Sequence, residues 1–410
     1  MEVYLFDWFN LLLRWLHVIV AIAWIGSSFY FVMLDNNLEL PQDDDLKKRG
    51  VDGELWAVHG GGFYNPQKYF VGPKVFPTRT LHWFYWEAYS TWLSGFALVC
   101  VVYLWNANVW LVDKRVFDWS GQAAAIAALV YLFAGWLAYD FICRFFGHNK
   151  DGSIGGDRRV GILISLYVVA ATWIACQLFA GRAAFLLTGA MLGTIMSANV
   201  FFWIIPGQRK VVAQLQRGEP VDPIHGQRGK QRSVHNTYFT LPVLIAMLSN
   251  HDAMLYQASF NWLILVLLML MGALIRAWFV LRHKGQQRVE LWLAAAVSLL
   301  LVLWLARPVT TATNAGAAAV GTSSTSSAST LAAVNIDDVQ AVLNARCVAC
   351  HNEQLASKNV QLQSTALIRQ HAEQIQQQVV ILKLMPMNNA TGITDAERAL
   401  IGRWFASLSR

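Results

Sequence analysis

The pentapeptide Cys347-Val348-Ala349-Cys350-His351 is the clearest chemical pattern in the chain. Two thiols at this spacing can each add to one vinyl group of a haem, and the histidine that follows can bind the iron. A redox dithiol or half of a zinc site are the alternatives for Cys-x-x-C. A zinc site needs a second ligand pair, and only His371 follows, with no further cysteine. We therefore expect one covalent haem c at Cys347 and Cys350, with His351 as an iron ligand.

The iron of such a haem needs another axial ligand, and two methionines lie downstream of the motif. Met385 stands directly before Pro386, and Met387 follows that proline. Ligation by one histidine and one methionine raises the reduction potential of the iron, which suits a group that accepts electrons. Either methionine could complete the ligand set.

The residues around the motif predict short helices. Asn335 can cap one helix that leads to the motif, and Thr394 with Glu397 forms a capping box that opens a final helix. The apolar stripe of that final helix comprises Leu400, Ile401, Trp404, Phe405 and Leu408. Residues 335–410 therefore resemble a small class I cytochrome c. Members of that family usually place the ligand methionine directly before a proline, which favours Met385.

The elements before this segment have the composition of a membrane protein. Apolar residues make up 56% of the chain and charged residues only 14%, well below the usual quarter for soluble domains. Stretches long enough to cross a bilayer lie near 9–31, 81–105, 121–143, 160–180, 183–205, 236–252, 259–281 and 289–306. The sixth stretch is the shortest and contains Pro242. We expect an all-α, polytopic bundle of about eight transmembrane helices followed by a small cytochrome c domain.

The distribution of Lys and Arg predicts how this bundle is oriented. With the N-terminus outside, the inside loops carry 19 basic residues and the outside segments carry 4. The outside four are Lys114, Arg115, Arg182 and Arg307. We therefore expect a multi-pass protein of the bacterial inner membrane with its C-terminus in the periplasm, where c-type haem is attached. The lipid bilayer is the first expected partner.

The same topology accounts for the net charge of +7. A nucleic-acid-binding face would need basic residues clustered on one soluble domain, so we expect no nucleic-acid partner. The first helix lacks a basic leading segment and a cleavage site, and is expected to be an uncleaved anchor. The expected organisation is a transmembrane domain over 1–307, a flexible Ala/Ser/Thr-rich linker over 308–334 and the cytochrome c domain over 335–410.

Ionisable residues inside predicted spans suggest a second cofactor site. Arg14, His17, Trp24 and Ser28 share one face of the first predicted helix. His251 lies at the outer end of the sixth and could reach the level of His17. A non-covalent haem b between these two histidines could pass electrons to the haem c. The alternative is that each histidine is satisfied by a neighbouring helix.

A further polar group falls at the predicted inner end of the bundle. The candidate catalytic residues are His82 and Glu87 on the second predicted helix, Asp140 on the third, and His235 on the sixth. Plain structural roles are the alternative, such as an ion pair between Asp140 and Arg144. The glycine-rich run 59–66 in the first inside loop is read as a re-entrant packing loop or as a binding loop for a flat ligand.

Four longer runs carry a family resemblance. They are Leu55-Trp56-Ala57-Val58-His59-Gly60-Gly61-Gly62-Phe63-Tyr64-Asn65-Pro66-Gln67-Lys68, His82-Trp83-Phe84-Tyr85-Trp86-Glu87, Ser197-Ala198-Asn199-Val200-Phe201-Phe202-Trp203-Ile204-Ile205-Pro206-Gly207-Gln208-Arg209-Lys210, and Lys230-Gln231-Arg232-Ser233-Val234-His235-Asn236-Thr237-Tyr238-Phe239-Thr240-Leu241-Pro242. The chain resembles the bacterial membrane-bound urate hydroxylases (PuuD type) over nearly its whole length. The resemblance implies oxidation of urate to 5-hydroxyisourate in purine breakdown, with electrons passed to cytochrome c. It implies no catalytic residues of the membrane part.

Three functions compete at this point. The first is a urate-oxidising enzyme that passes electrons through its own haem to a respiratory-chain acceptor, such as a soluble cytochrome c or a terminal oxidase. The second is a membrane-anchored cytochrome c electron-transfer subunit without its own substrate, for which so many helices are more than an anchor requires. The third is a purine transporter, but no inverted repeat is apparent in the sequence. The site of an enzyme should offer aromatic faces and a cation, because urate is planar and largely a monoanion at neutral pH.

Overall fold

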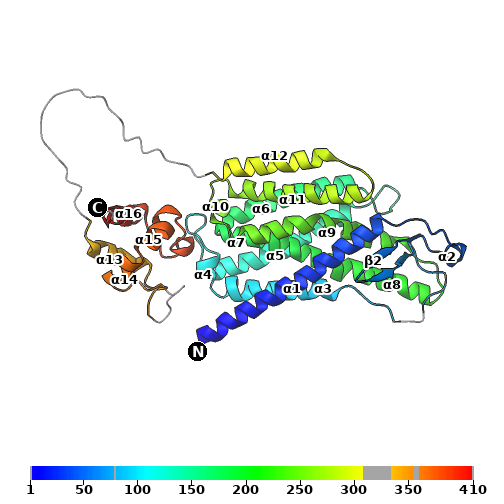
Figure 1. Cartoon of the computed structure of the whole chain (residues 1–410), viewed down its shortest axis with the longest axis horizontal. Coiled ribbons are helices and arrows are strands. Elements are labelled where there is room, and N and C mark those ends of the chain that lie inside the picture. Colours follow the sequence, from blue (N-terminus) through cyan, green and yellow to red (C-terminus); the bar gives the residue numbers. More distant parts are fainter. Residues whose placement is uncertain (1, 78–79, 308–333, 354–359, 409–410) are drawn as a thin grey trace, which may run out of the picture.

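The computed structural model of the chain describes residues 2–77, 80–307, 334–353 and 360–408. The helices form two bodies, each with its own hydrophobic core: a bundle over 2–307 and a smaller C-terminal body over the described residues from 334 onward (Figure 1). The structure is 70% helical with almost no strand, which confirms the all-α prediction. The predicted linker 308–334 lies outside the described residues except for its last residue.

Each of the eight segments predicted to span the membrane contains a helix, although the second, 81–105, becomes helical only at Trp86. The long helices of the bundle are α1 (Glu2–Asn36), α3 (Trp86–Leu98) continued by η1 (Val99–Leu104), α5 (Gly121–Phe146), α6 (Asp157–Leu178), α7 (Gly181–Ala198) continued by η2 (Asn199–Ile204) and α8 (Ile205–Gln216), α9 (Pro223–Ser249), α11 (Asn261–His283) and α12 (Val289–Leu305). Two short helices, α4 (Ala107–Trp110) and α10 (Ala253–Tyr256), lie between them. Six of the long helices are apolar and long enough to cross a membrane. The helix α12 is a shorter apolar helix, and α9 does not meet this measure.

The helix α9 differs most from its prediction, because it begins at Pro223 and not near residue 236. Asp222 caps its first turn by accepting a hydrogen bond from the Ile224 amide at 2.9 Å, and proline at the first helical position needs no such partner. The polar first half of α9 hides it from a search for apolar runs. Pro242 remains inside the helix, where Gly272 of α11 lets the two backbones approach closely.

The core of the bundle is built around α7. Its Phe185, Leu187, Met191 and Ile195 are fully buried, and it packs against α3, α5, α6 and α9. Small residues let the helices approach, as expected where lipid removes the hydrophobic drive for association. A Cβ atom at Gly135 of α5 would lie 2.5 Å from Cγ of Met191, so this glycine is required by the contact.

Two of the long helices contain a π-helical segment. The segment η1 ends α3, and η2 lies between α7 and α8. A π-helical turn carries one more residue than an α-helical turn and often occurs at functional sites. The polar residue Asn199 opens η2 and is fully buried, so the widened turn presents a polar side chain to the interior.

One end of the bundle carries the long loop between α1 and α3. The loop contains α2 (Asp44–Arg49) and four short strands, β1 (Gly53–Glu54), β2 (Ala57–His59), β3 (Gly62–Tyr64) and β4 (Gln67–Lys68). The strand β1 pairs antiparallel with β4, and β2 pairs antiparallel with β3, with Val58 opposite Phe63. Gly60 and Gly61 have φ of 60° and 80°, the left-handed values of a tight hairpin turn.

This hairpin corrects the prediction of a re-entrant packing loop. Trp56, Val58 and Phe63 are exposed by 67%, 69% and 77%, so the segment does not pack into the bundle. The strands β2 and β3 on either side of the Gly60-Gly61 turn have only three residues each, so the hairpin is too short to bury its side chains. The other prediction for this run, a binding loop for a flat ligand, is not tested by the structure.

The C-terminal body consists of short helices around a separate core. They are α13 (Ile336–Arg346), α14 (Thr365–Gln370), α15 (Ala372–Ile375) continued by the π-helical η4 (Gln376–Ile381), the 3-10 turn η5 (Met387–Asn389) and α16 (Asp395–Leu408). The predicted caps are confirmed: Asn335 accepts from the Asp337 amide, and Thr394 and Glu397 exchange hydrogen bonds as a capping box. Ile401 and Trp404 of the predicted stripe are buried, whereas Leu408 at its end is exposed.

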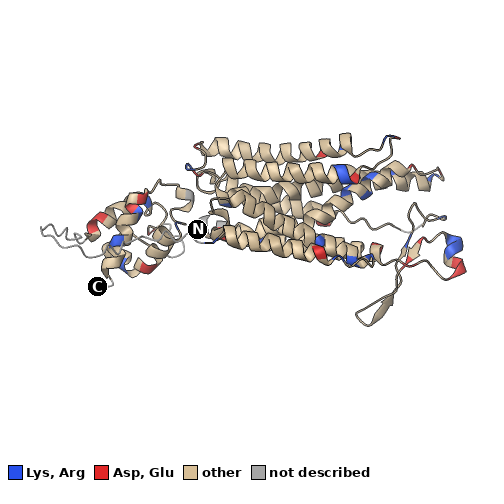
Figure 2. Cartoon of the chain, turned by 90° about the horizontal axis from the view of Figure 1, so that it is seen from above, with Lys and Arg blue, Asp and Glu red and all other residues tan. Residues whose placement is uncertain are grey.

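Among the described residues, the C-terminal body contacts one end of the bundle. The turn η5 packs against α4, and we call this the tail end of the bundle. The opposite end, with α2, α8 and the hairpin, is the loop end (Figure 1). Most Lys and Arg positions of the bundle lie toward the loop end, away from the C-terminal body (Figure 2). The orientation predicted from the loop charges would place the loop end on the cytosolic side, and it stays a prediction.

Candidate functional site

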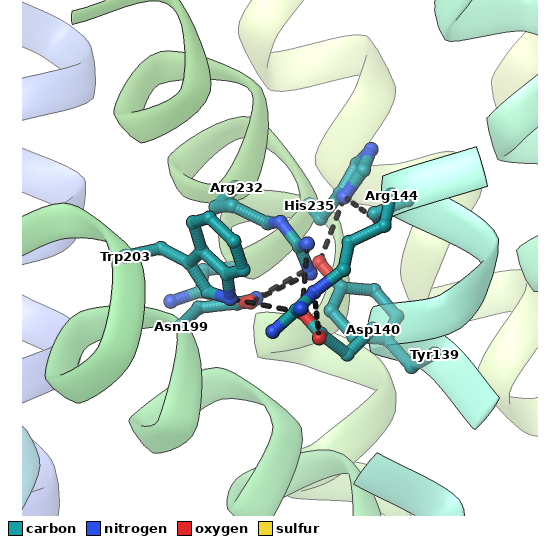
Figure 3. Close-up of polar contacts among 9 residues, drawn as sticks. Tyr139, Asp140, Arg144, Asn199, Trp203, Arg232 and His235 are labelled. Carbon is teal, nitrogen blue, oxygen red and sulfur yellow. Dashed lines mark hydrogen bonds and ion pairs between the residues drawn. The ribbon is translucent and has the colours of Figure 1, made fainter. Parts of the chain in front are cut away.

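A buried ionic cluster lies toward the loop end of the bundle. Asp140 of α5 is 5% exposed and receives three donors: Arg144 Nε at 2.6 Å, Arg232 Nη2 at 2.8 Å and Trp203 Nε1 at 2.8 Å (Figure 3). Arg232 of α9 is itself 4% exposed, whereas the Arg144 side chain is 57% exposed. The guanidinium of Arg232 also lies 5.1 Å from the ring centroids of Tyr139 and Trp203. The Asp140 carboxylate is therefore neutralised by two arginines, of which Arg232 is buried and Arg144 is exposed.

A chain of hydrogen bonds continues from this cluster. The Asn199 amide donates to the Tyr139 hydroxyl and to Asn236 Oδ1, both at 2.9 Å. The Tyr139 hydroxyl lies 2.8 Å from Nδ1 of His235. The bonds join α5, η2 and α9 and satisfy polar groups that would otherwise be costly in the interior. We call Tyr139, Asp140, Arg144, Asn199, Trp203, Arg232 and His235 the ionic cluster.

The π-helical segment η2 contributes two side chains, Asn199 and Trp203, to the ionic cluster. Asn199 and Trp203 lie four residues apart at the start and near the end of η2. From this turn Trp203 donates to Asp140, and Asn199 accepts a hydrogen bond from Arg232 Nη1 at 3.3 Å. The sequence Ser197–Lys210 is thus a local structure that aims polar groups inward, and not a plain continuation of α7.

Next to the cluster, the loop end of the bundle contains a cavity of about 370 Å³. It lies between α1, the start of α3, the α7–η2–α8 helix and α9. Its aromatic lining includes Trp24, Phe31, His82, Trp83 and Phe84; its polar lining includes Ser27, Ser28, Asp35, Glu87, Gln208, Ser233, Asn236 and Thr240. A cavity with aromatic walls and a few polar groups is the usual form of a small-molecule site.

The structure separates the four candidate catalytic residues into two neighbouring groups. His82 and Glu87 line the cavity, whereas Asp140 and His235 belong to the ionic cluster. Asn236 joins the two groups, because it lines the cavity and accepts the hydrogen bond from Asn199. His82 is not on a helix as predicted, since α3 begins only at Trp86. The segment before it stays non-helical while Phe84 packs edge-on against Phe31 of α1, with ring centroids 4.9 Å apart.

Glu87 has an unusual position among the lining residues. Its Oε2 atom is buried and has no hydrogen-bond partner in the part of the chain that the structure describes. A buried carboxyl oxygen without a partner is costly, and a ligand with an N–H group would satisfy it. The cavity therefore offers one free acceptor to a bound molecule.

The expected cation does not line the cavity among the described residues. The lining residue Asp35 pairs with a basic side chain outside the lining, since Nζ of Lys68 lies 2.5 Å from its Oδ1. Since Asp35 lines the cavity mouth, Lys68 neutralises one of its two carboxylates. The aromatic faces expected for a planar ligand are present in Trp24 and Trp83.

Of the two histidines of the predicted haem b site, His251 lies at the tail end and His17 lies near the middle of α1. Nδ1 of His17 is 3.0 Å from the Ser94 hydroxyl, and a Cβ atom at Gly95 would lie 2.8 Å from Cε1 of His17. His251 follows the end of α9, near enough to Arg14 for their charges to interact. Arg14 is one turn from His17 on α1. The His17 ring is thus held by the hydrogen bond of its Nδ1 with Ser94 and by its contact with Gly95. The role of His17 and His251 as haem ligands stays a prediction.

In the C-terminal body, the cysteine motif closes the turn after α13. Cys347 is buried and Cys350 is exposed, so the two cysteines of the turn differ in their access to solvent. Burial raises the pKa of the Cys347 thiol to about 11. Nδ1 of His351 lies 3.2 Å from the Val360 carbonyl, which fixes the ring and leaves Nε2 for an iron. The residues present therefore fit a covalently attached haem.

The two candidate methionines occupy different surroundings. Met385 packs against the core of the C-terminal body, and Arg398 donates to its carbonyl at 2.9 Å. Met387 belongs to η5, which contacts α4 of the bundle. The core position of Met385 agrees with its assignment as the iron ligand, which stays a prediction. Among the described residues, no group of three or more His, Cys, Asp or Glu is arranged to hold a metal ion.

Several residues of the site were not singled out from the sequence. Arg232 was counted only as a basic loop residue, and Asn199, Trp203 and Tyr139 were not considered as candidates. A polar residue such as Asn199 within an apolar stretch is a signal that could have identified one of them. Gln208 of the cavity carries no such signal, and Trp24, which was placed on the polar face of the first helix, reaches the cavity only through the packing of four helices.

Comparison with known proteins yields one match. The model of a family described as urate oxidase N-terminal matches residues 3–307, which is the whole bundle. No curated protein and no solved structure matches the chain. The match covers the cavity and the ionic cluster and does not extend to the C-terminal body.

Proposed function

Because the chain belongs to the urate oxidase N-terminal family, we propose that its bundle oxidises urate to 5-hydroxyisourate in purine breakdown. The electrons pass to a c-type haem in the C-terminal body and on to a respiratory-chain acceptor. The observation that carries this proposal is the loop-end cavity. It combines aromatic walls with the unpartnered Glu87 oxygen and lies within the segment that the family model matches.

The reaction sets the requirements for the site. Urate and one water give 5-hydroxyisourate, two protons and two electrons, with the new C–O bond at C5. Removing the electrons leaves an electron-poor purine that water attacks. The site must therefore hold a planar molecule, accept protons and leave room for one water. A cavity of about 370 Å³ accommodates both molecules.

The lining residues meet these requirements by their types. Trp24 and Trp83 offer flat faces against which the purine can stack. Asn236 and Gln208 offer amide groups that can pair with the carbonyl and N–H edges of urate. The ionic cluster holds Asn236 in place, since Asn199 donates to its side-chain oxygen and Asn236 itself donates to the Met196 carbonyl at 3.0 Å. In this scheme the cluster positions the site and does not touch the substrate.

Two cavity residues can accept the protons. Glu87 offers the free carboxyl oxygen, which pairs with an N–H of urate and takes its proton as electrons leave. The His82 ring lines the same cavity and can take the proton of the attacking water. His235 and Asp140 are engaged in the ionic cluster, which makes them positioning residues.

The C-terminal body would hold the haem that accepts the electrons. Cys347 and Cys350 would attach it, and His351 and Met385 would bind its iron. When bound, this group supplies a one-electron acceptor, which must be used twice for each urate. The hydrogen bond from His351 to the Val360 carbonyl orients the imidazole for this role.

We further propose that a haem b bound at His17 and His251 serves as a relay. The cavity lies at the loop end and the C-terminal body at the tail end. A haem held between them would supply an intermediate one-electron carrier. His17 lies between the two ends on α1, and Ser94 fixes one nitrogen of its ring. The test is the haem content: we expect two haems per wild-type chain and loss of the non-covalent one in His17→Ala. One haem c alone in the wild-type protein would contradict the relay.

The test of the function is urate-driven reduction of the haem in membranes. Glu87→Gln should lower the rate about 100-fold or more, because it removes a proton acceptor. The haem should still be reduced fully by dithionite. Glu290→Gln, on the surface of α12 and outside the cavity, is the matched control and should react at the wild-type rate. If urate leaves the wild-type haem oxidised while a quinol reduces it, the proposal is wrong and the chain is an electron-transfer subunit.

A further inference from the structure

The place where urate is oxidised and the place where its electrons leave lie at opposite ends of the bundle. The cavity is lined by Asp35, which is the residue before the end of α1, by His82 just before α3, and by Gln208 in α8. These positions all belong to the loop end. The C-terminal body instead contacts the bundle through η5 and α4, at the tail end.

The length of one continuous helix gives the distance between the cavity and the tail end of the bundle. The span from α3 through η1 covers Trp86–Leu104, 19 residues, and runs from the cavity to the segment that leads into α4. At 1.5 Å per residue this is about 28 Å, close to the 30 Å thickness of a hydrocarbon core. The electrons therefore cross most of the membrane on their way to the C-terminal body.

The groups of the cavity that can take up protons lie at the loop end. His82 and Glu87 line the cavity, and Asn236 connects the cavity to His235 through Asn199 and Tyr139. The basic residues of the inside loops mark the same end as cytosolic. Protons released by urate thus have acceptors on the cytosolic side, next to where the substrate is bound.

We propose that urate enters from the cytosolic side and that its oxidation by this chain is electrogenic, an inference that rests on the proposed function. For each urate and water converted to 5-hydroxyisourate, two protons remain on the cytosolic side. Two electrons move outward and reduce two equivalents of ferric haem, or of the acceptor that reoxidises it. The chain thus moves two negative charges across the membrane in each turnover.

The membrane potential acts on such a reaction with a definite sign. A potential that is negative inside pushes electrons outward and favours oxidation of urate. For an electron that crosses the whole core, the ratio of ferrous to ferric haem rises about 50-fold for every 100 mV. The cavity extends into the membrane from the loop end, so the observed factor should be somewhat smaller.

Sealed proteoliposomes of the full-length holoprotein test this inference. The population with the C-terminal body outside is selected, urate is placed in the lumen, and ferricyanide outside accepts the electrons. We expect an interior-positive potential, read by an oxonol dye, and acidification of the lumen. Valinomycin with potassium should abolish the potential and accelerate ferricyanide reduction, because it removes the opposing charge.

The outcomes distinguish this inference from the proposed function. Ferricyanide reduction without a potential, or equal reduction when urate is added on the side of the C-terminal body, overturns the electrogenic path and leaves urate oxidation standing. Absence of urate-driven reduction from either side overturns both. Interior-positive potential that depends on luminal urate supports the inference.

The side of entry can be read without any haem reaction. Ser233 lines the cavity and is exposed, so Ser233→Cys should react with a membrane-impermeant maleimide applied from the cytosolic face. Saturating urate should slow this labelling at least several-fold. Gln286→Cys, exposed in the loop after α11 and outside the cavity, is the matched control and should not be protected. Labelling of Ser233→Cys only from the opposite face would overturn cytosolic entry.

Discussion

The two arginines that bind Asp140 permit a sharp test of how burial sets the strength of an ion pair. Both lie within hydrogen-bonding distance of the same carboxylate, at 2.6 Å for Arg144 and 2.8 Å for Arg232. Their side chains differ in exposure, 57% against 5%. We expect Arg144→Gln and Arg232→Gln to differ strongly in stability although they remove the same charge.

The magnitudes follow from what each change leaves behind. An exposed ion pair contributes about 0–1 kcal/mol, so Arg144→Gln should lower the free energy of unfolding by no more than about 1 kcal/mol. Arg232→Gln removes a buried partner together with a bond to Asn199 and contacts over two rings, and should cost about 3 kcal/mol. Asp140→Asn leaves Arg232 buried without its counter-charge and should cost about 3–5 kcal/mol.

Equilibrium unfolding in mixed micelles, followed by circular dichroism, measures these differences. The double variant Asp140→Asn with Arg232→Gln should be less destabilised than the sum of the single variants, by about 2 kcal/mol, because the two groups act on each other. Equal destabilisation by the two arginine variants would refute the reasoning, since burial would then not decide the strength of the pair. An additive double variant would refute it as well.

Three further predictions concern other parts of the chain. Cys350→Ser should abolish normal covalent attachment of haem and halt electron exit while the bundle stays folded. A denaturing gel stained for haem measures the attachment, and size-exclusion chromatography reports whether the bundle stays folded. A full haem stain would contradict the motif assignment. Glu397→Ala should destabilise the C-terminal body by about 1 kcal/mol through loss of the capping box. The Thr394 amide and then Arg346 hold the pKa of the Glu397 carboxyl below its ordinary value, so this contribution is full above the unfolded-state pKa and is lost as pH falls through the folded-state pKa. A difference between wild type and variant that persists at pH 2 would contradict this. Gly135→Ala should destabilise the bundle by about 1–3 kcal/mol, because its Cβ would overlap Met191, whereas Gly161→Ala, with open space around it, should be neutral or slightly stabilising in thermal unfolding.

Local patterns were sufficient where one short segment contains all the information. The helices at each predicted span follow from runs of apolar residues, because a backbone in lipid must satisfy its own hydrogen bonds. The caps Asn335 and Thr394 follow from residues two or three positions apart, and both are confirmed. The start of α9 at Pro223 was missed because its first half is polar, so periodicity of apolar residues does not reveal it.

The candidate site divides along the same line. His82, Glu87, Asp140 and His235 could be selected from the sequence, since ionisable groups near a membrane interior are costly and stand out. Their division into a cavity pair and a cluster pair could not be predicted. It depends on the π-helical turn η2, from which Trp203 donates to Asp140 and Asn199 accepts a hydrogen bond from Arg232.

The amino-acid sequence by itself determined the features that are local: the Cys-x-x-Cys-His motif, from which haem attachment is predicted, the order of helices and the charge bias of the loops. Only the tertiary structure decided which polar groups remain free. Glu87 keeps an oxygen that has no partner among the described residues, in a cavity where four helices meet, while Asp140 is saturated by donors from three helices. The reason is that hydrogen-bond partners distant in sequence are set by packing, and packing depends on the shapes of all the helices at once.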